Sequence, residues 1–208
     1  MTTTSSTVFL VDDEAAIRDS LTALLQAKGY TVQSYSSAEK FLQECDPEQA
    51  GCIVLDVSMP GMSGVELQNE LMNRGFVSPI IFITGHGDVP LAVKAIKAGA
   101  IDFLEKPFRQ TALLELIEQA FEEDLQNRAT KKETDAVKSC FESLTPREKD
   151  VMRLLVSGPA NLSSKEVARE LGISHRTVHH HRARVMEKMQ AESLPDLVAK
   201  AKICRLND

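Results

Sequence analysis

The chain of 208 residues, 43% of them hydrophobic, is long enough for one large domain or for two small ones with separate cores. Its net charge of −6 is unevenly distributed. Residues 1–142 carry 12 Lys and Arg against 22 Asp and Glu, whereas residues 143–208 carry 12 Lys and Arg against 8 Asp and Glu. We therefore expect a polyanionic partner for the second part alone. No apolar run approaches the ~18 residues of a membrane span and the first residues lack the pattern of a signal peptide, so we expect neither feature, and a cytoplasmic protein.

Short apolar runs alternate with amphipathic stretches over residues 7–106. The runs predict strands, and they are 7–12, 31–35, 52–56, 79–84 and 101–105. Between them, apolar residues recur at helical spacing, and Gly29, Gly75 and Gly99 stand where helices should end. Five β-α units of this length predict an α/β domain over residues 1–122, with a doubly wound parallel sheet and helices on both faces.

A long helical pattern follows Pro107 and continues into a polar stretch without Pro or Gly at 126–135. Val137 and Phe141 then restore the apolar spacing. We expect one long helix, or two nearly continuous ones, over residues 109–141, and a flexible polar linker is the alternative.

Residues 143–208 predict an all-α domain of four helices. Capping-box patterns begin at Thr145 and Ser163, and Ser174 and Ser193 are further N-cap candidates. The predicted helices are about 145–157, 163–171, 175–190 and 193–204. The middle two are joined by the Gly-containing turn 171–174, as in a helix-turn-helix.

Charged side chains stand where the predicted strands end. Asp12 and Asp13 follow the first strand, Asp56 ends the third, and Lys106 follows the fifth. Because parallel strands end at one edge of the sheet, these groups should converge on one pocket. Such a cluster is costly without a neutralising cation, and its hard oxygen ligands favour Mg²⁺ or Mn²⁺ over zinc.

Asp56 is the predicted phosphoryl acceptor of this pocket. An aspartate can attack phosphorus to form an acyl phosphate, while a metal ion and Lys106 neutralise the charge. The Thr84 hydroxyl and the Gly85 amide, after the fourth strand, should contact the phosphoryl oxygens. Each residue alone has an ordinary explanation as a cap or turn residue, and it is their combination that indicates this chemistry.

Residues 7–122 resemble the receiver domain of two-component response regulators. The resemblance rests on Val-Asp-Asp-Glu (11–14), Leu-Asp-Val-Ser-Met-Pro-Gly (55–61), Thr-Gly-His-Gly (84–87), Gly-Ala-Ile-Asp-Phe (99–103) and Glu-Lys-Pro-Phe (105–108). It implies that a sensor histidine kinase phosphorylates Asp56 and that Asp13, Asp56 and the Ser58 carbonyl bind Mg²⁺, with Asp12 acting through water. It also implies that Lys106 pairs with the phosphoryl group before a cis bond to Pro107.

The same resemblance implies a switch. The Thr84 hydroxyl would move toward the phosphate while the Phe103 ring turns inward. Receivers of this kind dimerise on the face formed by residues 88–98 and 101–105, where we predict Val93, Ile96 and Lys97 as participants. Ordinary core packing is the alternative for Val93 and Ile96.

The predicted helix at 175–190 is a candidate DNA-recognition helix. Residues 174–189 hold four of the five histidines and four Lys and Arg against one acid. Val178, Val185 and Met189 form an inward apolar stripe. Facing or flanking the outside are Arg176, His179, His180, Arg182, Ala183 and Arg184. The second helix of a helix-turn-helix enters the major groove, and a solvated charged helix is the alternative.

Residues 143–204 resemble the LuxR/NarL-type DNA-binding domain, and the two resemblances together look like the FixJ subgroup. The motifs are Leu-Thr-Pro-Arg-Glu (144–148), Lys-Glu-Val-Ala-Arg-Glu-Leu-Gly-Ile-Ser (165–174), Arg-Thr-Val (176–178) and 181–189. They imply base contacts by His179, His180 and Ala183 and phosphate contacts by Arg176, Thr177 and Lys188. His175, Arg182 and Arg184 complete the predicted DNA-binding set, and residues 193–204 would pair two DNA-bound subunits.

Two segments depart from this family pattern. Residues 157–163 are longer than the expected tight loop, and His179-His180 replaces the acid or lysine followed by an apolar residue found in many relatives. His175 and His179 also have the spacing of a zinc pair, without an evident further ligand. The four cysteines, Cys45, Cys52, Cys140 and Cys204, are scattered and have neither a CxxC pair nor a neighbouring histidine at metal-ligand spacing. We expect them to be reduced thiols.

The predicted function is a phosphorylation-switched transcriptional regulator, an activator. Its expected partners are a sensor histidine kinase, promoter DNA, RNA polymerase and, after phosphorylation, a second copy of the chain. One alternative is a DNA-binding regulator that is independent of phosphate. Another is an aspartyl-phosphate phosphatase, but such enzymes need an acid where this chain has Ser58, so no catalysis is expected beyond self-phosphorylation and self-dephosphorylation.

Overall fold

The computed structural model describes residues 6–85, 96–97, 99–156 and 163–204. The chain divides into two compact units, Met1–Ala129 and Thr130–Asp208. The boundary falls within one helix, α5, which supplies residues to both units.

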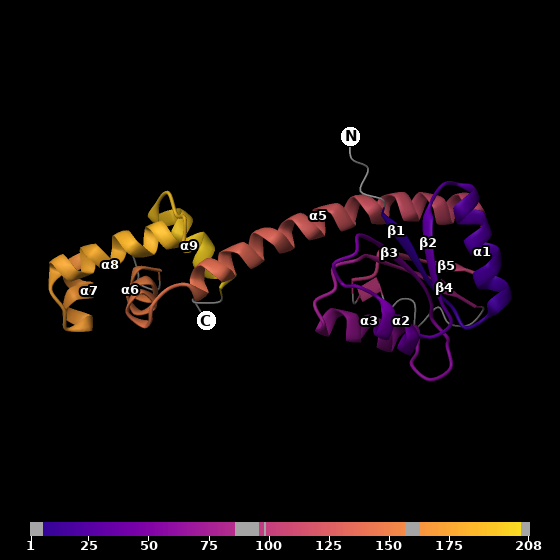
Figure 1. The fold of residues 1–208 in the computed structure, drawn as a ribbon, viewed down its shortest axis with the longest axis horizontal. Coiled ribbons are helices and arrows are strands. Elements are labelled where there is room, and N and C mark those ends of the chain that lie inside the picture. The colour runs from indigo at the N-terminus through magenta and orange to yellow at the C-terminus, as the bar shows by residue number, and fades with distance from the viewer. Residues whose placement is uncertain (1–5, 86–95, 98, 157–162, 205–208) are drawn as a thin grey trace. The chain divides into compact units, whose positions relative to one another are not determined.

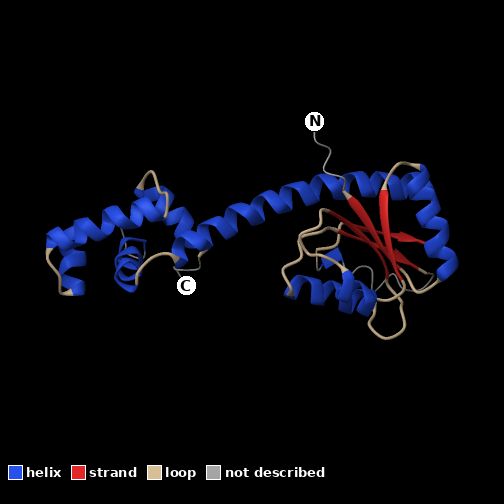
Figure 2. Cartoon of the chain, in the orientation of Figure 1, coloured by secondary structure: helices blue, strands red, loops and turns tan. Residues whose placement is uncertain are grey.

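The first unit is built on a five-stranded parallel sheet (Figure 2). The strands are β1 (Thr7–Val11), β2 (Thr31–Tyr35), β3 (Gly51–Asp56), β4 (Ile80–Thr84) and β5 (Asp102–Glu105), in the order β2-β1-β3-β4-β5. Each strand predicted from the sequence is confirmed to within one residue at either end. The order places β1, β3 and β4 at the centre, where every residue of these strands is buried.

Helices cover both faces of this sheet (Figure 1). Alternate strand residues serve opposite layers, so Phe9 packs with one layer and Leu10 with the other. The first layer includes α2 (Ala38–Glu44) and α3 (Gly64–Asn73), and the second includes α1 (Ala15–Ala27) and the start of α5 (Gln110–Glu142). The predicted doubly wound α/β fold is therefore confirmed.

Helix α5 runs without interruption from Gln110 to Glu142, as a long helix rather than the flexible polar linker. Its apolar positions Leu113, Ile117 and Ala120 are buried in the first unit. Val137 and Phe141, near its other end, pack against the core of the second unit. The polar residues between them supply no breaker, so helical hydrogen bonding continues through the segment.

The second unit contains the four predicted helices, each confirmed to within two residues. They are α6 (Pro146–Val156), α7 (Ser164–Leu171), α8 (His175–Lys188) and α9 (Leu194–Ile203). Their shared core includes Val151, Leu155, Val167, Val178 and Val185. None of the helices in the described part of the chain has the length and apolarity to cross a membrane.

Local hydrogen bonds define the helix-turn-helix of this unit. A capping box joins Ser163 and Glu166 at the start of α7, and the Ser174 side chain caps α8. Between the two helices, Gly172 adopts the left-handed conformation (φ 63°) that ends α7 and that glycine adopts at little cost. Helix α8 is thereby held as the second helix of the motif.

Candidate functional site

Two carboxylates meet at the carboxyl edge of the sheet because β1 and β3 are parallel neighbours. Val11 pairs with Leu55, so Asp12 and Asp56 emerge side by side. Both side chains are nearly inaccessible, with Asp12 1% and Asp56 6% exposed. Exposed Asp13 completes the group, and the ligand oxygens of the three residues lie within 4.8 Å of one another.

Lys106 supplies the positive charge of this acidic pocket. Its Nζ lies 2.7 Å from Asp56 Oδ2 and 3.1 Å from Asp12 Oδ2, and the Glu14 carboxylate is 4.0 Å away. The Lys106 amide donates to the Thr84 carbonyl at 2.8 Å, and the bond to Pro107 is cis. The residue after β5 thus brings an ammonium to the two carboxylates that follow β1 and end β3.

Burial and pairing act in opposite directions on the ionisation of these groups. Burial raises the pKa of Asp12, and hydrogen bonds from the Glu14 amide and Lys106 only partly offset it. Burial alone would lower the pKa of Lys106, but its hydrogen bonds to Asp56 and Asp12 outweigh that effect and raise it. Pairing with the two carboxylates therefore favours the charged form of Lys106.

Two supporting residues were not predicted from the sequence. The Arg18 guanidinium donates to the backbone carbonyls of Asp12 at 2.7 Å and Asp13 at 2.9 Å. The Glu14 amide donates to Asp12 Oδ1 at 2.8 Å. Arg18 follows the acidic pair by about one helical turn, but that spacing alone does not distinguish it from any exposed arginine of α1.

The predicted switch residues lie beside the pocket on β4 and β5. Thr84 is fully buried, and its hydroxyl donates to the Gly85 carbonyl at 3.2 Å. Phe103 and Ile96 are half-buried against the apolar layer that includes α2 and α3, and Lys97 is exposed. Val93, predicted with Ile96 and Lys97 at a dimer interface, lies outside the described residues.

An apolar groove of about 680 Å³ borders the acidic pocket. It extends from Lys106 between the first turns of α1 and the residues after β5, and its apolar lining is Ile17, Leu21, Leu24, Pro107 and Phe108. The groove places apolar surface next to the charged groups of the acidic pocket.

Helix α8 presents the predicted recognition surface of the second unit. Val178, Val185 and Met189 are buried, as the predicted stripe requires. The exposed positions are His175, Arg176, His179, His180, Ala183 and Arg184, while Thr177 and Arg182 are half-buried. Thr177 is also part of the helix start, where its hydroxyl lies 2.7 Å from that of Ser174.

Lys188, which is partly exposed, forms an ion pair with a buried acid of this unit. Its Nζ lies 2.7 Å from the buried Glu148 carboxylate and donates to the Ser143 carbonyl at 3.2 Å. Burial would raise the pKa of Glu148, but the bonds from Lys188 and Thr145 outweigh it and lower the value to about 2. Lys188 is thus bonded to Glu148 and Ser143 in the protein without DNA, and its phosphate contact stays a prediction.

The histidine pair considered as a zinc site lacks further ligands. The rings of His175 and His179 are edge to face, 4.5 Å apart. Among the described residues, no third histidine, cysteine or acid lies close enough to bind a metal ion together with them. Asp12, Asp13 and Asp56 of the first unit do form a group of three potential ligands. Two exposed imidazoles do not complete the four-ligand set of a structural zinc site.

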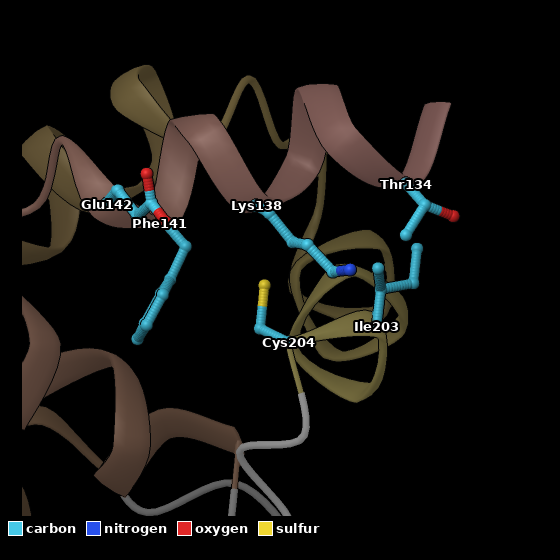
Figure 3. A pocket seen from close by; sticks show the side chains of 6 residues that line it. All are labelled: Thr134, Lys138, Phe141, Glu142, Ile203 and Cys204. Carbon is cyan, nitrogen blue, oxygen red and sulfur yellow. The ribbon is translucent and has the colours of Figure 1, made fainter. Parts of the chain in front are cut away.

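A second pocket, of about 690 Å³, lies between the end of α5 and the end of α9 (Figure 3). Its lining is Thr134, Lys138, Phe141, Glu142, Ile203 and Cys204. Burial raises the pKa of the Cys204 thiol, so the sulfur is not an activated nucleophile. All four cysteines are free thiols.

Comparison with known proteins gives two family matches. Residues 8–118 match the response regulator receiver domain, and residues 142–201 match the luxR family of bacterial regulatory proteins. Each matched segment contains one of the two sites described above, the acidic pocket and helix α8.

Similarity to individual relatives extends over nearly the whole chain. Nodulation protein W of Bradyrhizobium diazoefficiens is 46% identical over 195 residues, which cover 94% of this chain and 85% of that protein. Transcriptional regulatory protein FixJ of Rhizobium meliloti is 45% identical over 198 residues, covering 95% and 96%. The solved structure of the response regulator StyR is 44% identical and matches with a TM-score of 0.72, covering 95% of this chain and 98% of that one.

Proposed function

The chain belongs to the FixJ-like response regulators, which join a receiver domain to a LuxR-type DNA-binding domain, and we propose that phosphorylation of Asp56 switches its binding to DNA. The observation that supports this most directly is the pocket in which Lys106 bridges Asp56 and Asp12 at 2.7 and 3.1 Å. We take the regulator to be a transcriptional activator that acts with RNA polymerase in the cytoplasm.

The donor set of the pocket fits Mg²⁺, and Mn²⁺ would accept the same oxygens. Asp13 and Asp56 would bind the ion together with the Ser58 carbonyl, and Asp12 would bind through water. When bound, the ion would neutralise and orient the oxygens of the incoming phosphoryl group.

Asp56 would act as the nucleophile of phosphoryl transfer. A carboxylate oxygen forms the bond to phosphorus as the bond from phosphorus to the kinase histidine breaks. In the structure the Ser58 amide donates to Asp56 Oδ1 at 3.0 Å and the Lys106 ammonium donates to Oδ2 at 2.7 Å. The carboxylate would therefore be oriented before a phosphodonor binds. Lys106 stays close enough to neutralise charge on the transferred group.

The apolar groove beside Lys106 supports a protein as the phosphodonor. A sensor histidine kinase must bring its phosphohistidine to Asp56, and apolar surface along α1 and after β5 offers it an adjoining contact. A small phosphodonor such as acetyl phosphate would reach the same carboxylate without using the groove.

The switch would pass from the phosphoryl group to the face of β4 and β5. A phosphoryl oxygen offers the Thr84 hydroxyl a stronger acceptor than the Gly85 carbonyl, and the half-buried Phe103 can then move inward. This change would favour a receiver dimer, for which Val93, Ile96 and Lys97 are our candidate contacts. Dimerisation raises the effective concentration of the second DNA-binding unit at an operator with two half-sites.

Helix α8 would enter the major groove of the operator. Its exposed positions support base contacts by His179, His180 and Ala183. We assign backbone or flanking contacts to His175, Arg176, Thr177, Arg182, Arg184 and Lys188. Helix α9 would pair two DNA-bound subunits.

One experiment tests the proposal. DNA affinity and molecular mass are measured with and without acetyl phosphate and Mg²⁺, for the wild type and for Asp56→Asn. We expect the phosphodonor to raise both the dimer fraction and the affinity in the wild type alone. If both proteins bind DNA equally under all conditions, the pocket does not control the output, and the regulator acts independently of phosphate.

A further inference from the structure

Helix α8 carries three exposed histidines near its start, and the rings of two of them, His175 and His179, lie against each other. His175, His179 and His180 occupy its first two turns, and all three are exposed. His175 and His179 are four residues apart, with ring centroids separated by 4.5 Å. This face is the part of α8 that would meet the base edges in the proposed complex.

The charged groups on α8 itself are almost all cations. Arg176, Arg182 and Arg184 lie on the same helix, and its one acid, Glu187, is paired with Arg184 at 3.0 Å. In the described part of the chain no acid forms an ion pair with the three imidazoles. Protons gained by this face are therefore not balanced from within α8.

The neighbouring helices contribute few free acids. On α7, whose charged residues are Lys165, Glu166, Arg169 and Glu170, Glu166 is bonded to the Ser163 cap. On α6, Glu148 is paired with Lys188, and Asp150 lies near Arg147 and Arg153. On α9, Asp196 is paired with Lys200, and Lys202 is a further cation. Among the described acids of α6, α7 and α9, Glu170 is the one that forms no ion pair or cap bond, so a polyanion is the main source of compensating charge.

Histidine changes charge between pH 5 and 8, and this controls what the face offers to DNA. The ring centroids of His175 and His179 lie 4.5 Å apart, so two imidazoles would meet a bound duplex together. The phosphates of a duplex favour the cationic form of a nearby histidine. An imidazolium carries two diverging N–H donors, so one can donate to guanine N7 or O6 while the other meets a phosphate or water.

We propose that His175, His179 and His180 form a proton-linked recognition surface, which binds guanine-containing duplex DNA as imidazolium and takes up protons on binding. The proposal rests on the proposed function, in which α8 contacts the major groove. Because the complex holds more protons than the free protein, affinity rises as pH falls through the range in which histidine titrates.

The test uses the full chain and a duplex that the chain itself enriches from a random-sequence library at neutral pH. The dissociation constant is measured at constant ionic strength from about pH 6 to about pH 8, a range that covers histidine titration. Calorimetry in two buffers with different ionisation enthalpies gives the number of protons taken up. The variants are His175→Gln/His179→Gln/His180→Gln and, as a matched control, His181→Gln, which removes the half-buried histidine of the same helix, whose ring centroid lies 6.0 Å from that of His180.

We expect wild-type affinity to be about tenfold weaker at the high end of this range, with net proton uptake, since linkage gives that change for an average uptake of about half a proton over about two pH units. The triple variant should lose most of the pH dependence and the proton uptake, while His181→Gln keeps both. Helical circular dichroism of each variant verifies folding, and His180→Gln alone should lower proton uptake in part. Because His86 is common to all variants, their differences isolate α8.

Equal proton uptake by the wild type and the triple variant would overturn this proposal and leave the proposed function standing. A chain that binds no duplex at any pH, with or without acetyl phosphate, would overturn both.

Discussion

Arg128 and Asp124, one turn apart on α5, form a buried ion pair that ties this helix to the first unit. The Arg128 Nε lies 2.9 and 2.8 Å from the two Asp124 carboxylate oxygens. Asp124 also accepts from the Gly51 amide at 3.0 Å, and Arg128 donates to the Gln49 carbonyl at 2.7 Å and to Ser78 Oγ at 3.0 Å. The helix is thus held against the amino-terminal edge of the sheet, opposite the acidic pocket.

Asp124→Ala should lower the free energy of unfolding of the first unit by about 3 kcal/mol, because it leaves the Gly51 amide and the guanidinium without their carboxylate. Both tyrosines of the chain, Tyr30 and Tyr35, belong to this unit, so tyrosine fluorescence during urea unfolding reports on it. Arg74→Ala is the matched control, since its pair with Glu70 has the same spacing but is exposed, and its loss should cost less than about 0.5 kcal/mol. Equal losses in the two variants would contradict the role assigned to burial.

The Glu148–Lys188 pair predicts a pH dependence in the second unit. The pKa of Glu148 is lowered from 4.5 to about 2 in the folded state, so its contribution to stability is complete above pH 4.5 and is lost as pH falls toward 2. The shift corresponds to about 3 kcal/mol. Glu148→Gln should therefore be destabilised near neutral pH, and its difference from the wild type should shrink in acid. Hydrogen exchange of α6 and α8 measures this, and a difference that stays constant with pH would argue against the pair.

The acidic pocket predicts a selective loss of metal binding. Asp13→Asn should weaken Mn²⁺ binding by about tenfold, because it removes one anionic ligand from a hard-cation site. Asp19→Asn removes an exposed acid of α1 that is not part of the pocket. It should leave the affinity within about twofold, since solvent and salt screen an exposed charge that does not contact the metal. Electron paramagnetic resonance of free Mn²⁺ gives both constants. Chelation of the metal should also stop phosphorylation by acetyl phosphate, and a phosphorylation rate that chelation leaves unchanged would contradict the metal requirement.

Gly64 lies against the phosphoacceptor strand and should not tolerate a side chain. A Cβ at this position would lie 2.2 Å from the Asp56 carbonyl oxygen and 3.1 Å from the Phe82 ring. Gly64→Ala must displace the end of β3, so we expect a loss of about 2 kcal/mol in stability and slower phosphorylation. Asn69→Ala, at an exposed site of the same helix, is the control. Wild-type phosphorylation of Gly64→Ala would mean that the position of Asp56 is less constrained than the contact implies.

Local patterns in the sequence were enough to predict the elements and the acidic pocket. Apolar runs and caps such as Ser163 and Ser174 depend on neighbours within a few residues, so their structural effect can be predicted along the chain. The convergence of Asp12, Asp56 and Lys106 followed because every strand in a parallel sheet ends at the same edge. The predicted DNA surface followed from the helical period of Val178 and Val185.

Tertiary packing decided the partners of the charged groups. Lys188 satisfies Glu148, forty positions away, and Arg128 satisfies carbonyls some eighty positions away; no local pattern distinguishes either from an exposed cation. The same holds for Arg18, which stabilises the loop of Asp12 and Asp13. The sequence by itself determined the strands, the helices and the edge of the sheet at which the carboxylates gather, because periodicity and capping are local. Only the folded structure decided which cations remain free for a ligand and which are used internally, because that choice depends on which buried groups packing brings within reach.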